Sequence, residues 1–324
     1  MEDRIQKLSA ELTKQVGKVI VGKERTLRLM LASLFCQGHI LLDDMPGVGK
    51  TTLIKTLSIA LGCEFKRVQF TSDLLPSDVL GMHIFDRKTE DFRLMKGPVM
   101  TNVLLADEIN RAIPRTQSAL LEAMEERQVT LDGNVYPLPS PFLVMATQNP
   151  VDLESTFRLP AAQLDRFFVR LSVGYPTPEQ EADMLRVVGN EIPFGSVTPV
   201  TDPEEICAFQ REIWDVYVSE SILNYIVALS DATRNHPLIR TGVSPRGSRA
   251  LYRGAKALAA MDARGFVTPD DVQELFAPIF CHRLVLSNEA RLAGKDAAKL
   301  MDEIIGSISV PPDKTAFFES GPIC

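Results

Sequence analysis

Cysteine and histidine are scarce in this sequence, and neither occurs in a metal-binding or disulfide pattern. The 324 residues include five cysteines and four histidines. No two cysteines form a CxxC pair, and no two histidines have HxxH or HxxxH spacing. These absences argue against a disulfide framework and against a zinc site, so free thiols are expected. A GxSxG segment is also absent, which removes the hydrolase chemistry that depends on that turn.

Long apolar runs and a surplus of positive charge are lacking as well. No run approaches the roughly 20 apolar residues that cross a bilayer, and the start Met1-Glu2-Asp3-Arg4 lacks the apolar core of a signal peptide. We therefore expect a cytoplasmic protein with no membrane span. The formal net charge of −7 argues against a protein that follows a nucleic-acid backbone. With 45% hydrophobic and 24% charged residues, the composition is typical of a globular protein of about two domains.

What the sequence does contain is a strand, a glycine turn and a helix start in direct succession, over residues 39–52. The apolar residues 40–42 predict a buried strand, and a helical pattern follows Gly49. Backbone N–H groups at such a helix start bind phosphate, Lys50 adds a positive charge, and the Thr51 hydroxyl can hold Mg²⁺.

The match to the phosphate-loop pattern GxxxxGK[ST] has one departure. Asp44 stands where the pattern has its first glycine, whereas residues 47–51 keep the half that contacts phosphate. A glycine-rich turn with a solvated lysine is the alternative interpretation. The strand before the turn and the helix after it are the context that the motif requires, so we predict a site for a nucleoside triphosphate.

Apolar segments and helical patterns alternate over the first half of the chain. Strands that are buried on both faces read as continuous apolar runs, which favours a parallel sheet. Strands spaced by helices predict a doubly wound α/β domain whose ligand lies at the carboxyl ends of the strands. Two hairpins are expected within it, over residues 82–96 and 128–137, and the second contains the hairpin signal Asp132-Gly133. The five predicted strands cover residues 40–42, 65–70, 102–108, 142–146 and 167–173.

Helix starts replace strands after Gly174. Three of them combine a capping side chain, a proline at the first helical position and an acid or amide three residues after the cap. They begin at Thr177, Asp202 and Thr268. We therefore predict a nucleotide-binding α/β domain over residues 1–175, a small all-α domain over residues 176–310, and an extended tail over residues 311–324.

Asp107 and Glu108 end an apolar strand and are the first candidates for chemistry. A carboxylate beside a phosphate loop can hold Mg²⁺ through water, and a neighbouring carboxylate can polarise an attacking water. Taken alone, such a pair is more often a solvated turn. Its position after a buried strand, in a chain that also has a phosphate loop, favours the functional interpretation.

Three further polar residues are candidates, each with an alternative. Asn149 ends a strand, where its amide could orient water near the γ-phosphate or could simply serve a turn before proline. Arg246 follows Ser244-Pro245 at a helix start, where the helix dipole disfavours a cation, so it faces either a nearby acid or the phosphates of a nucleotide. Arg166 either neutralises charge on a neighbouring subunit's triphosphate or pairs with Asp165 at the surface.

Taken together, these segments resemble an AAA+ ATPase, and their amino-acid sequences resemble those of the MoxR group. The resemblance covers nearly all of residues 15–310 and implies a doubly wound, five-stranded parallel sheet followed by a helical lid. The order and spacing of residues 44–51, 103–108, 142–149, 164–167 and 244–246 match the AAA+ motifs, and residues 69–78, 106–112 and 117–124 look like MoxR signature segments.

The resemblance implies ATP and Mg²⁺ as cofactors and assigns roles to single residues. Lys50 would be the phosphate-binding lysine, and Thr51 and Asp107 would hold Mg²⁺. Glu108 would be the catalytic carboxylate. The nucleotide would be contacted by Val21, Gly22, Pro46, Gly47, Val48, Gly49, Lys50, Thr51, Thr52, Asp107 and Arg246.

The remaining roles concern sensing and assembly. Asn149 would be sensor 1, Arg246 would be sensor 2, and Arg166 matches the arginine finger that acts on a neighbour's ATP. Asp44 and Ala161 depart from the family pattern, and neither change removes a catalytic group.

An ATPase of this kind is similar to ring-forming, usually hexameric machines. The first hypothesis is a chaperone-like remodeller or maturation factor for a protein client, with a von Willebrand factor A domain protein as partner and with the two hairpins facing the pore. Insertion of a metal, as in magnesium chelatases, would be a narrower case of it.

Two alternatives belong to other functional classes. A nucleic-acid motor needs cations on its pore loops, but no Lys or Arg occurs between Arg127 and Arg158. A nucleotide-gated scaffold without turnover would not need Glu108 and Arg166, and both are present.

Overall fold

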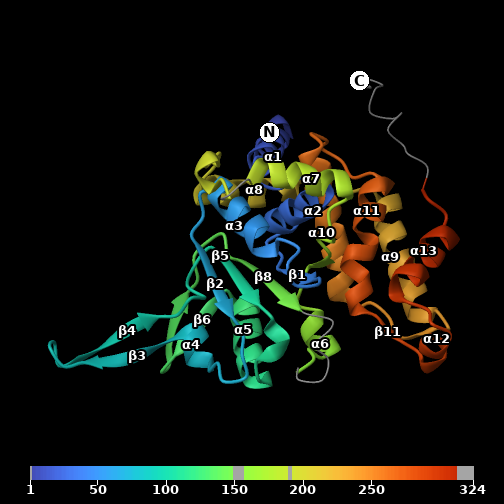
Figure 1. Ribbon diagram of the computed structural model, residues 1–324. Coiled ribbons are helices and arrows are strands. Elements are labelled where there is room, and N and C mark those ends of the chain that lie inside the picture. Colours follow the sequence, from blue (N-terminus) through green and yellow to red (C-terminus); the bar gives the residue numbers. More distant parts are fainter. Residues whose placement is uncertain (1, 149–156, 189–191, 312–324) are drawn as a thin grey trace, which may run out of the picture. The chain divides into compact units, whose positions relative to one another are not determined.

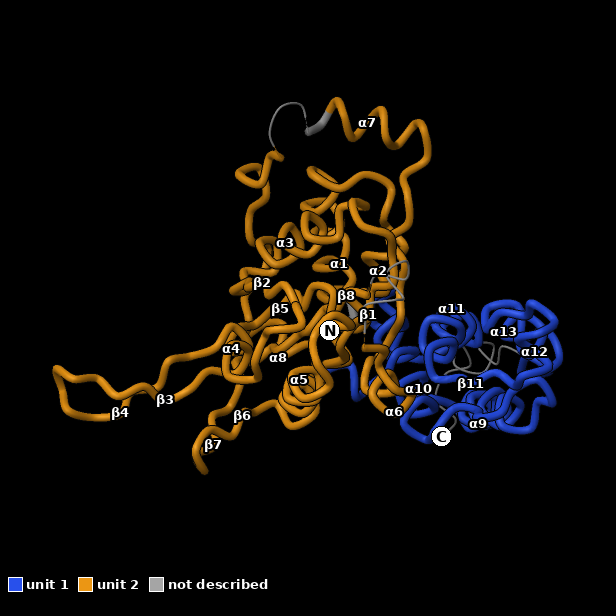
Figure 2. The backbone as a smooth tube through the Cα atoms, turned by 60° about the horizontal axis from the view of Figure 1, so that its bottom comes forward, with its two compact units in different colours: residues 1–2, 212–324 blue, residues 3–211 orange. Residues whose placement is uncertain are grey.

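The computed structural model describes residues 2–148, 157–188 and 192–311 (Figure 1). Two compact units make up the chain, and Figure 2 colours them separately. We call residues 3–211 the sheet unit, and residues 212–324 together with residues 1–2 the helical unit. Among the helices of the described residues, none is long and apolar enough to cross a membrane.

The sheet unit is built on five parallel strands in the order β2-β5-β8-β1-β9. This arrangement confirms the predicted doubly wound α/β class, because the strand order requires crossover connections. The strands are β1 (Ile40–Asp43), β2 (Phe65–Gln69), β5 (Val103–Asp107), β8 (Leu143–Gln148) and β9 (Val169–Leu171).

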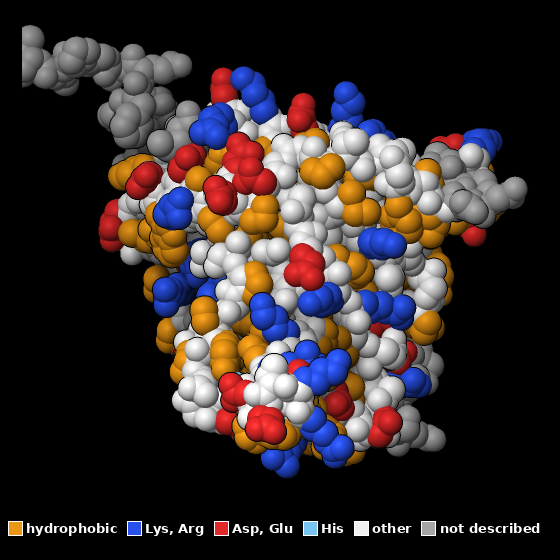
Figure 3. Space-filling view, turned by 90° about the vertical axis from the view of Figure 1, so that its left-hand side faces the viewer, with side chains coloured by type: hydrophobic (Ala, Val, Ile, Leu, Met, Phe, Trp, Pro, Cys, Tyr) orange, Lys and Arg blue, Asp and Glu red, His pale blue; other side chains and the backbone are white. Residues whose placement is uncertain are grey.

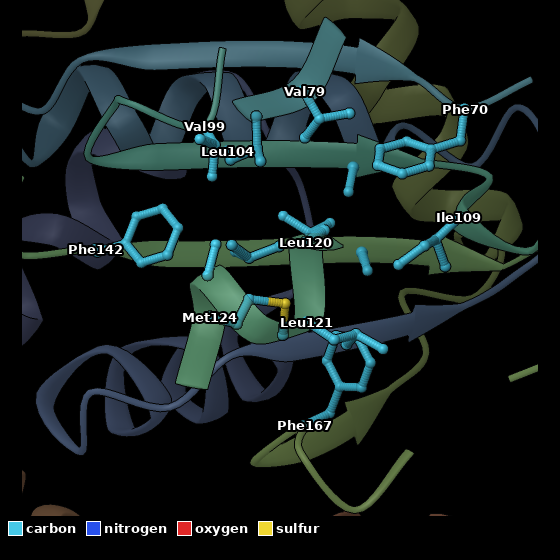
Figure 4. Packing of buried hydrophobic residues seen from close by; sticks show 14 of the residues in the cluster. Phe70, Val79, Val99, Leu104, Ile109, Leu120, Leu121, Met124, Phe142 and Phe167 are labelled. Carbon is cyan, nitrogen blue, oxygen red and sulfur yellow. The ribbon is translucent and has the colours of Figure 1, made fainter. Parts of the chain in front are cut away.

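Helices cover both faces of this sheet (Figures 1 and 4). On one face, α5 packs over the strands, and its buried residues Leu120, Leu121 and Met124 belong to one hydrophobic cluster with strand residues such as Leu104 and Val144. The other face carries α2 and α3. Because both faces are buried, the three central strands read as continuous apolar runs. The helices of the sheet unit are α1 (Glu2–Val16), α2 (Glu24–Phe35), α3 (Lys50–Ala60), α4 (Pro76–Leu80), α5 (Pro114–Glu126), α6 (Ala161–Leu164), α7 (Pro178–Val188) and α8 (Pro203–Glu212).

Two antiparallel hairpins extend from the sheet unit. β3 (Gly81–Asp86) pairs with β4 (Asp91–Lys96), and β6 (Gln128–Leu131) pairs with β7 (Asn134–Pro137). They occupy the two segments that the sequence marked as hairpins. Asp132 and Gly133 form the second turn with φ values of +49° and +83°, the left-handed conformation that a tight hairpin turn requires.

The helical unit consists mainly of helices packed on one another. The three helix starts identified in the sequence use their side chains as expected, and the one in this unit is a capping box in which Thr268 N donates to Asp271 Oδ2 at 2.8 Å. Its elements are α9 (Glu220–Asn235), β10 (Ile239–Thr241), α10 (Pro245–Met261), α11 (Pro269–Phe280), β11 (Val285–Leu286), α12 (Asn288–Leu292) and α13 (Ala297–Ser307).

The compact units and the predicted domains divide the chain at different places. α7 and nearly all of α8 follow residue 175 but belong to the sheet unit. The domain division after residue 175 stays a prediction. Of the predicted tail, only Pro311 lies within the described residues.

Candidate nucleotide site

The turn between β1 and α3 has the backbone geometry of an anion-binding loop. Gly47 and Gly49 have φ values of +86° and +85°, and α3 begins at Lys50 directly after Gly49. A Cβ atom at either glycine would meet nothing within 4 Å, so glycine is required here for its backbone conformation and not for space. The free N–H groups of the first turn of α3 lie in this loop and can donate to phosphate oxygens.

Lys50 donates hydrogen bonds to the backbone of its own loop. Its Nζ atom donates to the carbonyl oxygens of Asp44 and Met45, both at 2.9 Å. These acceptors are uncharged, so a phosphate could replace them with a stronger, charge-assisted partner.

Asp44, the departure from the strict motif, has a structural role that the sequence did not indicate. Its side chain is buried and accepts hydrogen bonds from Ser172 Oγ at 2.5 Å, Val173 N at 2.7 Å and Gly174 N at 3.0 Å. The loop is therefore tied to the chain that follows β9.

The two carboxylates at the end of β5 are held by a network from three strands. Thr147 on β8 donates from Oγ1 to Asp107 Oδ1 at 2.6 Å and accepts from Glu108 N at 2.8 Å. Glu108 has a φ of +55°, which turns its side chain out of the strand direction. Gln69 on β2 donates to Glu108 Oε2 at 2.7 Å, and Arg111 lies 3.0 Å from the same oxygen.

The loop and the carboxylates line one cavity of about 360 Å³, which we call the loop cavity. Six residues of the predicted loop and both carboxylates reach it, as do Arg67, Gln69 and Thr147, which the sequence analysis did not single out. The predicted residues are Pro46, Gly47, Gly49, Lys50, Thr51, Thr52, Asp107 and Glu108.

A second cavity of about 190 Å³ lies beside the first and shares Gly49 and Thr52 with it. We call it the apolar cavity, because aliphatic side chains predominate in its lining, among them Val21 and Val48. A polar cavity joined to an apolar one suits a ligand that has a phosphate chain at one end and a flat ring at the other.

Gly22 supports the wall of the apolar cavity. It has a φ of +70°, and a Cβ atom there would lie 2.0 Å from the Nε2 atom of Gln180, which lines the cavity. Only glycine combines this conformation with this close approach.

The donor atoms of the loop cavity fit Mg²⁺ together with a nucleotide. Thr51 and Asp107 present hydroxyl and carboxylate oxygens to the same space, and Mg²⁺ prefers one or two such ligands completed by water and substrate phosphates. Among the described residues, no group of three or more His, Cys, Asp or Glu forms a closed metal cage.

The other three predicted site residues lie on the segment after α6, in the helical unit and outside the described part of the chain. Arg166 lies after α6, and its Nε atom is 3.1 Å from Glu125 Oε2 on α5. Arg246 is in the first turn of α10 in the helical unit. Asn149 is outside the described residues, so its role stays a prediction, as do those of the two arginines.

His39 precedes β1 and is buried. Its Nδ1 atom accepts from Val144 N and its Nε2–H donates to Met124 O, both at 3.0 Å, so the ring is neutral and joins β8 to α5. Burial and the nearby charge of Arg127 lower its pKa from 6.5 to about 4.

Comparison with known proteins identifies the class from both units. Residues 39–169 match the ATPase family associated with various cellular activities (AAA), and residues 231–304 match the AAA lid domain. A crystal structure of a protein from Cytophaga hutchinsonii that carries a provisional ATPase name superimposes with a TM-score of 0.90 and 37% sequence identity, covering 96% of this chain and 97% of that one.

Individual relatives narrow the class to one family. The protein YeaC of Bacillus subtilis is 45% identical, over 97% of this chain and 98% of its own. The chaperone MoxR1 of Mycobacterium tuberculosis is 37% identical, over 92% of this chain and 81% of its own. The chain belongs to the MoxR family of AAA+ ATPases.

Proposed function

We propose that this protein hydrolyses ATP to ADP and phosphate in a Mg²⁺-dependent reaction at the loop cavity. The observation that carries the proposal is that Lys50, Thr51, Asp107 and Glu108 line one cavity, with an apolar cavity beside it. The phosphates would bind at the loop between β1 and α3, and the adenine would lie against Val21, Gly22 and Val48.

Each side chain would have a defined part in the reaction. Lys50 would give up its bonds to the loop carbonyls and bind the phosphates, and Glu108 would orient the attacking water and accept its proton on a carboxylate oxygen. Thr51 and Asp107 would hold Mg²⁺, which supplies positive charge to the phosphates when bound. Asn149 and Arg246 would sense the γ-phosphate as sensors 1 and 2.

We place Arg166 in the active site of a neighbouring subunit. Among the described residues, the loop cavity is lined without it, and it lies on the segment that enters β9. An arginine supplied in trans stabilises charge that develops on the transferred phosphoryl group. The protein would therefore act as a homo-oligomeric ring, a hexamer by analogy with AAA+ machines.

The work done by hydrolysis would be chaperone-like remodelling or maturation of a protein client in the cytoplasm. One relative is itself named a chaperone. The β3–β4 hairpin exposes Phe85 and Phe92, whose ring centroids lie 5.4 Å apart. Such an exposed aromatic pair suits contact with a protein surface. A von Willebrand factor A domain protein would be the partner, as the family resemblance implies.

The hairpins do not favour a nucleic-acid motor. Figure 3 looks onto the side from which β3–β4 projects and shows cationic and anionic side chains interspersed. The turn of this hairpin carries Asp86, Glu90 and Asp91 beside Arg87 and Lys88, and the β6–β7 hairpin has no cation between residues 128 and 137. A surface that follows phosphates would need a continuous positive charge.

ATP hydrolysis measured against protein concentration tests the proposal, with sedimentation alongside. Specific activity should rise as the protein assembles, and Glu108→Gln should abolish turnover while it still binds ATP. Arg166→Ala should reduce turnover at least 100-fold, whereas Arg115→Ala, which removes an exposed arginine on α5, should not. Activity that is independent of concentration, together with an active Arg166→Ala, would rule out the shared site.

A further inference from the structure

Arg67 lies on the edge strand β2 and reaches the carboxylate that is proposed to hold Mg²⁺. Its Nε and Nη2 atoms lie 3.1 and 2.7 Å from Asp107 Oδ2. The other oxygen, Oδ1, accepts the hydrogen bond from Thr147 at 2.6 Å. Both oxygens of Asp107 are therefore engaged by side chains of this chain itself.

The register of the sheet sets this geometry. β2 and β5 run parallel, with Arg67 opposite Leu105 and Gln69 opposite Asp107. Arg67 and Gln69 are two residues apart and so share one face of the strand, where Arg67 Nη2 also donates to Gln69 Oε1 at 3.1 Å. Lys66 points to the opposite face and pairs with Glu64 at 3.2 Å.

We propose that Arg67 is a tethered cation that competes with Mg²⁺ for Asp107 and thereby sets the Mg²⁺ concentration at which the site is loaded. The inference rests on the proposed function, since it takes Asp107 as a metal ligand. A guanidinium that donates twice to Oδ2 takes up the acceptor sites of that oxygen, and its charge repels a divalent cation that approaches the same carboxylate, directly or through water. Metal loading at Oδ2 would therefore displace Arg67 from Asp107.

The exposure of the pair limits the size of the effect. The Arg67 side chain is 47% exposed and that of Asp107 is 14% exposed, so water and salt screen part of the attraction. Breaking such a pair costs enough to weaken metal binding about five-fold, which adjusts the affinity without blocking the site. Arg67 is thus a positioning residue that acts through Asp107.

Binding of Mn²⁺ tests this directly without turnover. The loss of the free Mn²⁺ signal in electron paramagnetic resonance would be titrated with the full-length protein and a non-hydrolysable ATP analogue. Arg67→Gln should bind Mn²⁺ about five-fold more tightly than wild type. Lys66→Gln, which removes one positive charge from the same strand on the other face, should stay within two-fold of wild type. Arg67→Lys keeps the positive charge but loses the pair of N–H donors that the guanidinium presents, so it should give an intermediate affinity for Mn²⁺.

The outcomes separate this inference from the function on which it rests. Arg67→Gln with the affinity of Lys66→Gln, or with a weaker one, overturns the competition. Wild type that binds the analogue but no Mn²⁺ overturns the metal site, and the competition with it. If circular dichroism shows that Arg67→Gln does not fold, Arg67→Lys decides, since an affinity equal to that of wild type contradicts the proposal.

Discussion

Asp44 shows how a single residue can break a sequence motif and still serve the site. Three donors converge on its carboxylate, from Ser172, Val173 and Gly174. Glycine, the residue of the strict pattern at this position, could accept none of them. Here the side chain of Asp44 ties the loop to the segment after β9, in addition to the backbone conformation of the loop glycines.

Replacing Asp44 with glycine should therefore destabilise the protein, although it restores the strict motif. The N–H groups of Val173, which is buried, and of Gly174, which is half-buried, would lose their acceptor, at a cost of about 2–4 kcal/mol. Equilibrium unfolding in urea measures the change. Asp44→Asn keeps one carbonyl oxygen as an acceptor and should cost about half as much, whereas an Asp44→Gly protein as stable as wild type would contradict the assigned role.

Lys50 and Arg67 differ in how far the role of a charged side chain could be predicted from the sequence. Lys50 could be assigned to phosphate from the sequence, because the helix start that directs it is local. Arg67 lies 40 positions before Asp107 and has no motif around it. Its only sequence signal is a cation in an alternating strand at the edge of the sheet, which is also typical of a solvated residue.

At the scale of elements, the site depends on the carboxyl ends of β1, β5 and β8 lying at one edge of the sheet. At the opposite edge of the sheet, His39 joins the start of β8 to the end of α5, because it accepts from Val144 N and donates to Met124 O. A neutral imidazole can do both at once, whereas a protonated one can only donate.

The pH dependence of stability should reveal the His39 bridge. Its pKa is about 4 in the folded protein and about 6.5 unfolded, so the unfolded chain binds more protons between these values. The stabilisation is fully present above pH 6.5 and is lost as the pH falls toward 4, to a total of about 3 kcal/mol. His39→Gln does not titrate there, so its free energy of unfolding should fall less steeply over this range. Parallel curves for the two proteins would contradict this prediction.

The helix starts were the elements most accessible from the sequence. The caps at Thr177, Asp202 and Thr268 all make the expected backbone hydrogen bonds, because a cap and its partner are three residues apart. Strand lengths were harder to predict from the sequence. The segment 167–173 was expected to be one strand, but β9 is only Val169–Leu171, since a strand ends where its neighbour stops pairing with it.

At the scale of the whole molecule, the proposed active site would be divided between two copies of the chain. The loop cavity has its own lysine and carboxylates, and the proposed finger Arg166 serves the next subunit. Activity would then be a property of the ring.

Mixing two inactive variants provides the sharpest test of that division. Lys50→Ala loses its own site but keeps Arg166, and Arg166→Ala keeps its site but loses the finger. In randomly mixed rings at equal amounts, about a quarter of the sites combine an intact loop with a neighbour's finger, so about a quarter of wild-type activity should return. A mixture that remains as inactive as its components would show that the two residues do not act in one shared site.

Features that depend on neighbouring residues could be predicted from the sequence alone. The phosphate loop, the helix caps, the hairpin turn at Asp132-Gly133 and the α/β class could be read because each is set by contacts within a few positions or by the burial pattern of one segment. The order of the strands and the partners of Asp44, His39 and Asp107 became known from the folded structure. Those partners lie dozens of residues or more away along the chain and meet only because parallel strands, joined by crossovers, bring equivalent ends of neighbouring strands to the same edge of the sheet.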